Sequence, residues 1–426
     1  MTHPLAGIAA RWSAGEPVGI TSVCSAHPAV IDAALRLALE SGRPVLIEAT
    51  CNQVNQDGGY TGMTPAAFRD FVMAIAAEVG LPADRIVLGG DHLGPNPWRD
   101  LPASEAMDKA EAMIAAYAGA GFTKLHLDCS MGCAGEPAAL PDAVVAERAA
   151  RLAAAAEANA GAQTPVYVIG TEVPVPGGAA EALDGVEVTA PADVLETYGV
   201  HREAFGAAGL AEAFGRVIAV VVQPGVEFGH SDVVRFEPEA ARELTASLSE
   251  MPGAVFEAHS TDYQDADALA ALVRGGFCIL KVGPWLTFAL REALYGLDAA
   301  ADVLEGHPPR GRLMAEMEAV MRAAPGNWSR YYHGDDAALW LQRHFSYSDR
   351  IRYYWPDAAA RGAVGRLRAR LGGREIPEPV LRQYLPGLSA GTGAMTMDDA
   401  VRAAIQNVLR LYDAASTGRE THPRDR

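Results

Sequence analysis

Eight short apolar segments in the first 283 residues constrain the fold of this chain more than any other feature. Several are nearly continuous runs of Val, Ile and Leu, which is typical of parallel strands buried on both faces. Longer amphipathic segments lie between them. One of these begins with Thr64-Pro65, a helix N-cap followed by proline at the first helical position. The expected strands are residues 18–26, 44–50, 85–92, 124–130, 165–172, 216–223, 254–259 and 277–283.

Eight strands that alternate with helices predict a closed (β/α)₈ barrel, the α/β fold known as the TIM barrel. An open, doubly wound sheet is the alternative, but it usually has about five or six such units. The chain has 426 residues and a barrel needs about 250, so a second region is expected. We assign residues 1–300 to the barrel and 301–426 to a helical extension packed on it, with a flexible tail from about residue 416.

The composition excludes several classes of protein. The net charge of −18 argues against nucleic acid, which needs a basic surface. No membrane helix or signal peptide is recognisable, so we expect a cytoplasmic protein. The chain has no GxxxxGK(S/T) loop and no GxGxxG turn between a strand and a helix, so we expect no nucleotide cofactor and exclude a P-loop kinase. The five cysteines are expected to be reduced thiols.

Polar side chains are concentrated at the carboxyl ends of the expected strands. In a (β/α)₈ barrel these ends and the loops after them form one face, which carries the active site. Residues far apart in the chain therefore become neighbours on this face. The polar residues at these positions are Asn52, Gln53, Asp91, His92, His126, Asp128, Glu172, Gln223, Glu227, His230, His259, Ser260, Thr261, Asp262 and Lys281.

The histidines at the strand ends indicate a metal site. A single histidine there is more often a hydrogen-bonded structural residue, but His92, Glu172 and His259 share the same placement on the third, fifth and seventh strands. Two imidazoles and a carboxylate can hold a divalent ion with a position open for substrate. Zinc is the first choice, with manganese, cobalt and magnesium as alternatives. The ion polarises a ketose carbonyl and stabilises an enediolate.

Carboxylates beside this ion are candidates for moving protons. Asp91 precedes His92, and Asp128 lies at the rim of the fourth strand. Glu172 is a candidate both as a catalytic group and as a metal ligand. His126 lies two residues before Asp128, on the same side of the strand, and we expect it deeper in the core.

The remaining residues suit a sugar phosphate. Barrels of this kind often bind phosphate at a helix N-terminus after the eighth strand, where this sequence reads KVGPWLT. We place the phosphate at Gly283, with Ser260 and Thr261 beside it. Arg350 and Arg352 can either clamp a phosphate or pair with acidic residues of the barrel, and the pairing is slightly favoured. Further substrate contacts are expected from Asn52, Gln53 and Lys281.

Several strings of residues are similar to a known family. They include NQVNQDGGYTGMTP, GGDHLGPNPW, HLDCSMGCAGEP, VVVQPGVEFGH, AHSTDYQ and SDRIRYYWP, and the similarity runs from about residue 5 to about residue 415. On these motifs the chain resembles the so-called non-catalytic subunit family of bacterial tagatose-1,6-bisphosphate aldolase, from galactitol and N-acetylgalactosamine catabolism. The resemblance implies a partner required for the activity and stability of a class II aldolase chain. Some members of the family instead interconvert tagatose 6-phosphate and fructose 6-phosphate by epimerisation at C4.

The resemblance extends to the zinc-dependent class II aldolases. Asp91-His92 resembles their pair in which aspartate moves the proton and histidine binds zinc, and His259-Ser260 resembles a later ligand segment. The middle zinc histidine of the aldolases has no clean counterpart, so the third ligand is open. Its candidates are Glu172, Glu227 and Gln223.

Two functional hypotheses follow. The first is metal-dependent inversion of C4 in tagatose 6-phosphate, by retro-aldol cleavage between C3 and C4, rotation of the bound aldehyde and re-addition. The second is a non-catalytic partner that binds a class II aldolase catalytic subunit. Carboxylates in a cleft favour the first, because a structural partner does not need them, whereas the family's usual description favours the second. Both predict a phosphorylated ketohexose as ligand, and we expect a homo-oligomer.

Overall fold

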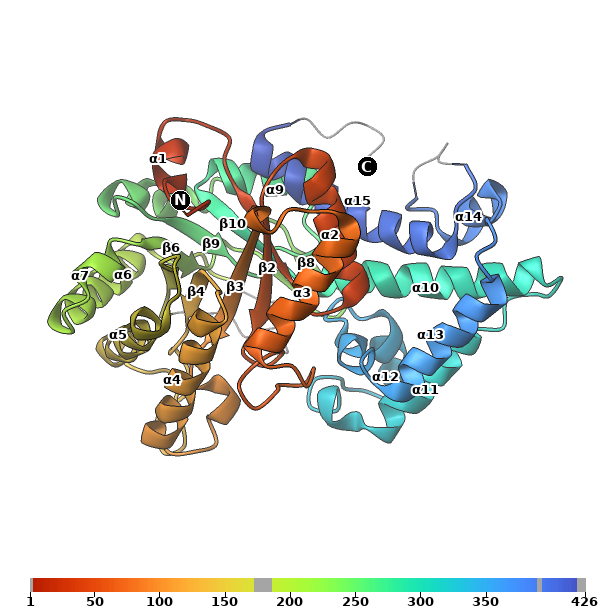
Figure 1. Cartoon of the computed structure of the whole chain (residues 1–426), viewed down its shortest axis with the longest axis horizontal. Coiled ribbons are helices and arrows are strands. Elements are labelled where there is room, and N and C mark those ends of the chain that lie inside the picture. The colour runs from red at the N-terminus through yellow and green to blue at the C-terminus, as the bar shows by residue number, and fades with distance from the viewer. Residues whose placement is uncertain (1–2, 172–185, 389–392, 420–426) are drawn as a thin grey trace.

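A closed barrel of eight parallel strands forms the centre of the molecule (Figure 1). The computed structural model describes residues 3–171, 186–388 and 393–419. Every expected strand is present, so the predicted (β/α)₈ barrel is confirmed. In their order around the barrel the strands are β1 (Ile20–Cys24), β10 (Phe277–Val282), β9 (Val255–Ala258), β6 (Val217–Val222), β5 (Val166–Ile169), β4 (Lys124–Leu127), β3 (Ile86–Leu93) and β2 (Val45–Thr50).

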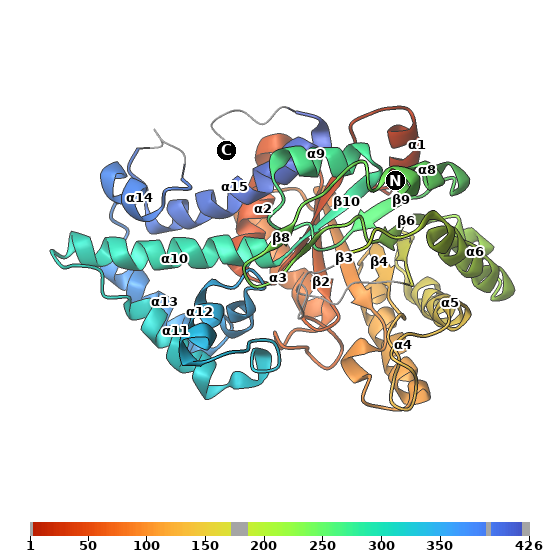
Figure 2. The ribbon, with the colours of Figure 1, turned by 180° about the vertical axis from the view of Figure 1, so that it is seen from behind.

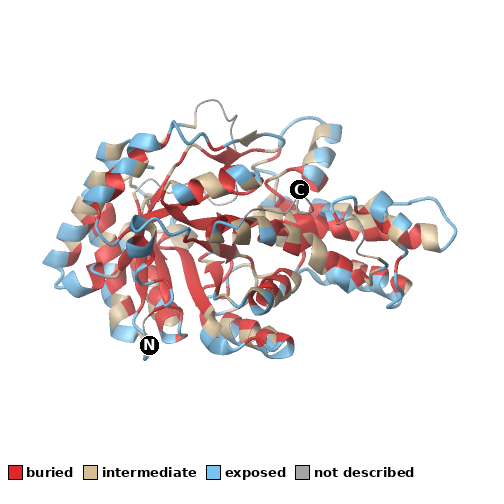
Figure 3. Ribbon diagram, turned by 90° about the horizontal axis from the view of Figure 1, so that it is seen from above, coloured by how far each residue is buried: buried red, intermediate tan, exposed pale blue. Residues whose placement is uncertain are grey.

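Helices cover the outside of the barrel, and their exposed residues lie on the outer side, away from the buried strands (Figure 3). The expected cap is present, because Thr64 Oγ1 accepts a hydrogen bond from the Ala67 N–H at the start of its helix. The helices that follow the first seven barrel strands in the chain are α2 (Pro28–Ser41), α3 (Pro65–Val79), α4 (Ala103–Gly119), α5 (Asp142–Asn159), α6 (Pro191–Ala207), α8 (Arg242–Ser247) and α9 (Ala266–Arg274). Smaller elements are α1 (Ile8–Ser13), α7 (Ala211–Phe214) and the hairpin of β7 (Glu227–Phe228) and β8 (Val233–Val234). Among the described helices, none combines the length and the apolar character needed to cross a bilayer.

The chain after β10 is helical, as expected. Its first helix, α10 (Pro284–Leu304), runs away from the barrel and forms the long axis of the extension (Figures 1 and 2). The expected boundary near residue 300 lies inside this helix. The later elements are α11 (Arg312–Ala323), α12 (Asp336–Phe345), the 3-10 helix η5 (Arg350–Tyr354), α13 (Ala358–Leu371), α14 (Glu378–Tyr384) and α15 (Met397–Thr417).

The last helix returns to the barrel wall. α15 packs against β1 and lies between α9 and α2, where the ring of barrel helices would otherwise be open (Figure 2). The Gly19 N–H at the start of β1 donates to the Ser416 carbonyl at 3.0 Å, and Arg43 Nη1 lies 2.6 Å from Asp413 Oδ1. The expected flexible tail from residue 416 therefore overlaps the end of α15, and residues 420–426 lie outside the described part of the chain.

The interior of the barrel changes from apolar to charged along its axis. At the amino ends of the strands, Leu46, Val87 and Ile218 pack with Leu5 and Ile8 of the N-terminal segment. Nearer the carboxyl ends, the buried side chains are ionisable. This change places the charged layer directly beneath the face on which the loops lie.

Two lysines and three carboxylates form the charged layer. Lys124 Nζ lies 2.7 Å from Glu48 Oε1 and 2.6 Å from Glu257 Oε2, and all three side chains are fully buried. Lys281 also pairs with Glu48, and its Nζ lies 2.8 Å from Asp91 Oδ1. Buried charges are tolerated only when each has opposite partners at short range. The alternation of sign within this layer satisfies that condition.

We predict that Lys124→Met lowers the free energy of unfolding by about 3–5 kcal/mol, because Glu48 and Glu257 lose the cation that they share. Denaturant titration followed by circular dichroism measures the change. Lys109→Met is the matched control: Lys109 is on the surface, 3.5 Å from Asp57, and its loss is expected to cost less than about 1 kcal/mol. Equal losses for the two variants would contradict the structural role of the charged layer.

Candidate active site

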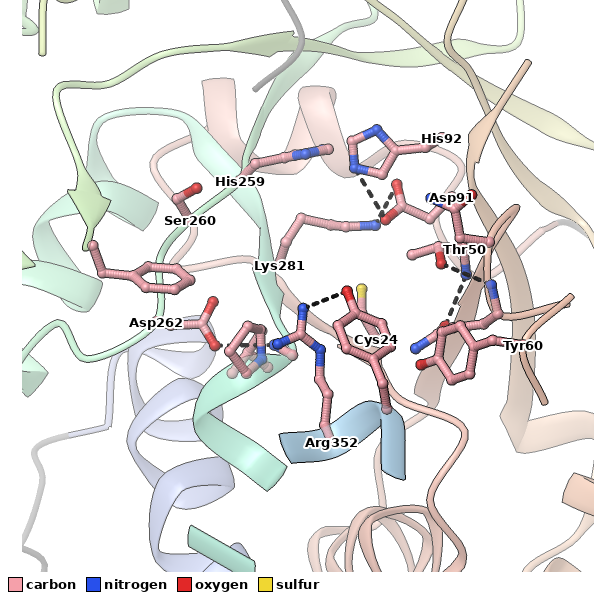
Figure 4. A pocket seen from close by; sticks show the side chains of 17 residues that line it. Cys24, Thr50, Tyr60, Asp91, His92, His259, Ser260, Asp262, Lys281 and Arg352 are labelled. Carbon is pink, nitrogen blue, oxygen red and sulfur yellow. Dashed lines mark hydrogen bonds and ion pairs between the residues drawn. The ribbon is translucent and has the colours of Figure 1, made fainter. Parts of the chain in front are cut away.

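A pocket opens above the charged layer, at the carboxyl ends of the strands (Figure 4). It encloses about 710 Å³, counted out to its mouth. The strand-end face therefore carries a concave site, as the fold predicts. The expected site residues that line the pocket are Asn52, Gln53, Asp91, His92, His259, Ser260, Lys281 and Gly283.

Three imidazole rings meet at the base of this pocket. The ring centres of His92 and His259 are 4.9 Å apart, and the ring of His126 lies 5.2 Å from the first and 5.3 Å from the second. His126 is fully buried, as we expected, but it contacts both predicted ligands. A tetrahedral ion that binds three imidazole nitrogens at about 2.0–2.1 Å holds the ring centres roughly 5 Å apart. The ring-centre spacing fits such an ion, and ligand atoms of His126 and His259 lie within 4.8 Å of each other, in a group that does not include His92.

Each imidazole has one nitrogen bonded to a carboxylate. An ionised carboxylate only accepts hydrogen bonds, so these pairs favour the tautomer whose bonded nitrogen carries the hydrogen and whose second nitrogen can serve as a ligand. His126 Nε2 is such a nitrogen: it is buried and has no hydrogen-bond partner among the described residues. The three pairs are His92 Nδ1–Asp128 Oδ2 at 2.8 Å, His126 Nδ1–Asp91 Oδ1 at 2.9 Å and His259 Nε2–Glu257 Oε1 at 3.0 Å.

Two residues at the base of the pocket have left-handed backbone conformations. His92, near the end of β3, has φ of 49°, and Ser260, just after β9, has φ of 53°. Such conformations in residues other than glycine cost about 1–3 kcal/mol and persist where the surroundings fix them, often at functional sites. The register between β3 and β4 shifts at this point of β3, and the His92 ring lies beside the His126 ring.

The charges at the base of the pocket also suit a divalent cation. Four buried carboxylates face two lysines, which is an excess of two negative charges before the imidazoles are counted. Ligand atoms of one buried group lie within 4.8 Å of one another, close enough to share an ion. That group is Asp91, His126, Glu257 and His259. The residues therefore form a buried cluster with the composition and charge of a divalent metal site.

The carboxylates and the lysine at this base are held in their charged forms. Burial alone would raise the pKa of Asp91, but the charges of His92 and Lys281 hold it well below its usual value. Burial alone would also raise the pKa of Asp128. The hydrogen bond from His92 has the opposite effect, and the pKa of Asp128 is lowered. The pKa of Lys281 lies well above its usual value, because Asp91 outweighs the effect of burial.

Two other carboxyl groups titrate closer to neutral pH. Burial raises the pKa of Asp262 to about 6 and that of Glu227 to about 7. Asp262 lines the pocket directly. A group that titrates near pH 7 is better suited to exchange a proton than one held permanently ionised. Asp262 stands in the sequence among the strand-end residues, but nothing there distinguishes it from its neighbours.

The candidates for the third metal ligand are placed differently from our expectation. Gln223 Oε1 accepts hydrogen bonds from the N–H groups of Gly225 and Val226 at 2.8 and 2.9 Å, which shapes the turn after β6. Glu227 Oε1 accepts from the Phe228 N–H at 2.9 Å. Glu172 lies outside the described residues, so its predicted role stays a prediction. Among the described residues, the imidazole that lies beside the two predicted ligands, His92 and His259, is that of His126.

Two of the groups that we expected to bind phosphate are already hydrogen-bonded to other groups of the protein. Thr261 Oγ1 donates to the Lys281 carbonyl at 2.6 Å, and its side chain is fully buried. The Gly283 N–H donates to Asp262 Oδ1 at 3.1 Å. Ser260 lies at the pocket wall and is half-buried. Of these three residues, Ser260 is the one whose side chain lines the pocket.

The helical extension contributes part of the pocket wall. Arg352 and Tyr353 of η5 line the pocket, and Figure 4 shows the Arg352 guanidinium directed into the open space. Arg350, on the same short helix, does not line it: its Nε donates to the carbonyl of Asn327. Neither arginine forms the expected ion pair with a barrel carboxylate among the described residues.

The fold and the site together define a (β/α)₈ barrel protein with a histidine–carboxylate cluster of the kind that binds divalent cations. The model of the D-tagatose-1,6-bisphosphate aldolase subunit GatZ/KbaZ-like family matches residues 5–417. The chain belongs to this family, as its motifs predicted.

Relatives with two different names match along almost the whole chain. The D-tagatose 6-phosphate 4-epimerase of Agrobacterium fabrum is 56% identical over 426 residues, which are 99% of this chain and 100% of that protein. The D-tagatose-1,6-bisphosphate aldolase subunit GatZ of Salmonella enteritidis is 51% identical over 412 residues, 95% of this chain and 97% of that protein. A crystal structure described as a probable tagatose 6 phosphate kinase from Sinorhizobium meliloti has a TM-score of 0.87 and 58% identity, and covers 93% of this chain and 100% of that one.

We predict that the chain binds one divalent cation and that His126→Ala weakens this binding at least about tenfold, because one of three imidazole ligands is lost. Asp128→Asn is expected to cost about 10- to 100-fold, since it removes the carboxylate that orients His92. Chelator competition and metal analysis of the dialysed protein measure both effects. His333→Ala, at an exposed position, is the control. Unchanged affinity in His126→Ala would show that the three imidazoles do not share an ion.

Proposed function

We propose that this chain is a divalent-metal-dependent epimerase that converts tagatose 6-phosphate to fructose 6-phosphate by inverting C4, with zinc as the first choice of metal. The observation that carries the proposal is the set of three imidazoles, each backed by a carboxylate, at the base of a pocket on the catalytic face of a barrel. A relative with 56% identity over its full length bears the name of this epimerase.

Inversion at C4 requires cleavage and re-formation of the C3–C4 bond. The proton of the C4 hydroxyl moves to a base, C4 becomes an aldehyde, and the bonding electrons pass to an enediolate over C2 and C3. After the aldehyde has turned its opposite face to C3, the bond forms again and the proton returns to O4. A cation at the imidazoles supplies Lewis acidity for the carbonyl and the enediolate oxygens.

The residues of the chain have separate tasks in this scheme. His92, His126 and His259 would hold the cation, and the carboxylates bonded to these rings fix their orientation. Asp91 and Asp128, which we expected to move protons, are better suited to this positioning because their pKa values are low. Asp262 lines the pocket and has a pKa raised to about 6 by burial, so it is our candidate for the proton at O4.

A second function is supported by the other relatives. Several proteins with about half of their residues identical to this chain are named subunits of D-tagatose-1,6-bisphosphate aldolase. A chain that acts only as such a subunit would bind a class II aldolase catalytic chain and raise its activity. The buried histidine–carboxylate cluster favours intrinsic catalysis, because association with a partner does not require it.

We predict that the purified chain alone, supplied with a divalent ion, converts tagatose 6-phosphate to fructose 6-phosphate. Carbon-13 NMR of the mixture identifies the product without coupling enzymes. His92→Ala is expected to lower kcat/KM by at least about 100-fold, since a ligand of the ion is lost. Removal of the metal by a chelator is expected to abolish turnover, and added zinc to restore it.

The same samples separate the two functions. No conversion with zinc, manganese, cobalt or magnesium, combined with stimulation of an added aldolase catalytic chain, would replace the epimerase by the partner role. A His92→Ala protein that binds metal and turns over normally would leave the fold intact but refute the site.

A further inference from the structure

We infer that Arg352, a residue of the helical extension, binds the phosphate group of the substrate. The assignment rests on the proposed function, because it concerns the phosphate of the same ketohexose phosphate. It moves the phosphate from the backbone N–H groups at the N-terminus of α10, where the sequence pattern placed it, to a guanidinium of the helical extension that lies near this helix end (Figure 4).

The N-terminus of α10 already has an anionic partner. Asp262 Oδ1 accepts hydrogen bonds from the N–H groups of Gly283 and Trp285, at 3.1 and 2.8 Å. Free N–H groups at a helix N-terminus are what attracts a phosphate to this position in other barrels. Here these N–H groups are engaged by a carboxylate and are therefore not free to bind a phosphate.

Arg352 has donors available for a ligand. Its Nη1 donates to the carbonyls of Ser348 and Asp349, and its Nη2 donates to Tyr353 Oη at 2.9 Å. A guanidinium has five N–H donors, so the Nε hydrogen and one Nη2 hydrogen remain. Two donors on one edge of a guanidinium match two oxygens of a phosphate.

The charge of Arg352 is also available. Arg343, in the same extension, is neutralised by Glu318 at 2.5 Å, whereas Arg352 has no carboxylate ion-pair partner among the described residues. The other cation in the pocket wall, Lys281, lies between Glu48 and Asp91 and is already compensated. Arg352 is therefore the cation of this pocket that a dianionic group can pair with.

The position of Arg352 suits the length of the substrate. In Figure 4 the guanidinium lies across the open space from His92 and His259, with Lys281 between them. In a ketohexose 6-phosphate the reacting C3–C4 bond is at the middle of the carbon chain, and the phosphate is on the terminal C6, two carbons beyond C4. A sugar whose C3–C4 bond lies near the imidazoles therefore extends its phosphate toward Arg352.

Buried contacts fix the segment that carries Arg352. Asp349 is buried with φ of 44°, and its carboxylate accepts hydrogen bonds from Thr287 Oγ1 at 2.7 Å and Arg291 Nε at 3.1 Å. Both partners belong to α10, whose N-terminus lies at the end of β10. The guanidinium is thus held in place before the ligand binds, which lowers the entropic cost of binding.

A phosphate site at Arg352 has a consequence for the reaction. Cleavage of the C3–C4 bond leaves the phosphate on the C4–C6 aldehyde fragment. This fragment must stay in the pocket while its aldehyde group turns, and a bond between its phosphate and Arg352 retains it. In this scheme the extension retains the aldehyde fragment through Arg352, so that the C3–C4 bond re-forms before the two fragments are released.

Binding of fructose 6-phosphate and of fructose to the full chain, measured by calorimetry, tests the inference. The wild-type protein is expected to prefer the phosphorylated sugar. Arg352→Gln is expected to weaken binding of fructose 6-phosphate at least about 30-fold, as for loss of one partner of a buried charged contact, and to leave fructose unchanged. Arg350→Gln is the matched control, because Arg350 is on the same turn but does not line the pocket. A folded Arg352→Gln protein that still prefers the phosphorylated sugar as the wild type does overturns the inference.

A crystal structure of the unmodified chain with fructose 6-phosphate keeps the test independent of how the variant folds. A phosphate in hydrogen-bond contact with the Arg352 guanidinium supports the inference, and a phosphate at the Gly283 N–H or elsewhere overturns it. Both measurements need no turnover. Phosphate-dependent binding through Arg352 in a chain that does not epimerise would refute the proposed function alone, whereas epimerisation with unchanged binding in Arg352→Gln would refute this inference alone.

Discussion

The pairing of buried charges inside the barrel is the constraint on which the rest of the structure depends. Lys124 and Lys281 stand between Glu48, Glu257 and Asp91, and none of these side chains can be removed without leaving an opposite charge in a medium that solvates it poorly. Two of these carboxylates also orient imidazoles: Asp91 bonds a ring from β4, and Glu257 bonds the ring that follows β9. The same interactions therefore stabilise the barrel and position its site.

The extension and the barrel form one functional structure. α15 fills the place between α9 and α2 and contacts β1, so the last helix of the chain completes the wall around the first strand. η5 supplies Arg352 and Tyr353 to the pocket, and buried contacts of Asp349 hold it on α10. The pocket is thus built from segments at both ends of the chain, in keeping with a family match that spans residues 5–417.

Much of the site was predictable from the sequence, and the failures have physical causes. The placement of Asp91, His92 and His259 followed from the rule that strand ends converge on one face. His126 was assigned to the core because its depth on β4 suggested it, but the interior of this barrel is itself charged at that depth. Gln223 looked equivalent to the other strand-end residues, although its side chain is engaged in a turn. The position of a residue at a strand end does not tell which backbone groups of the following loop its side chain will bind.

The sequence by itself determined the barrel and the face that carries the site, because the alternation of apolar strands with helices and the polar strand ends are local patterns. It also determined the family, through long strings such as AHSTDYQ. Only the tertiary structure decided that three imidazole rings meet at the base of the pocket, that Asp262 caps α10 and that Arg352 lines the pocket. These outcomes depend on which side chains meet across the barrel and from the extension, and on the charge balance of the buried groups, neither of which is a property of any single segment.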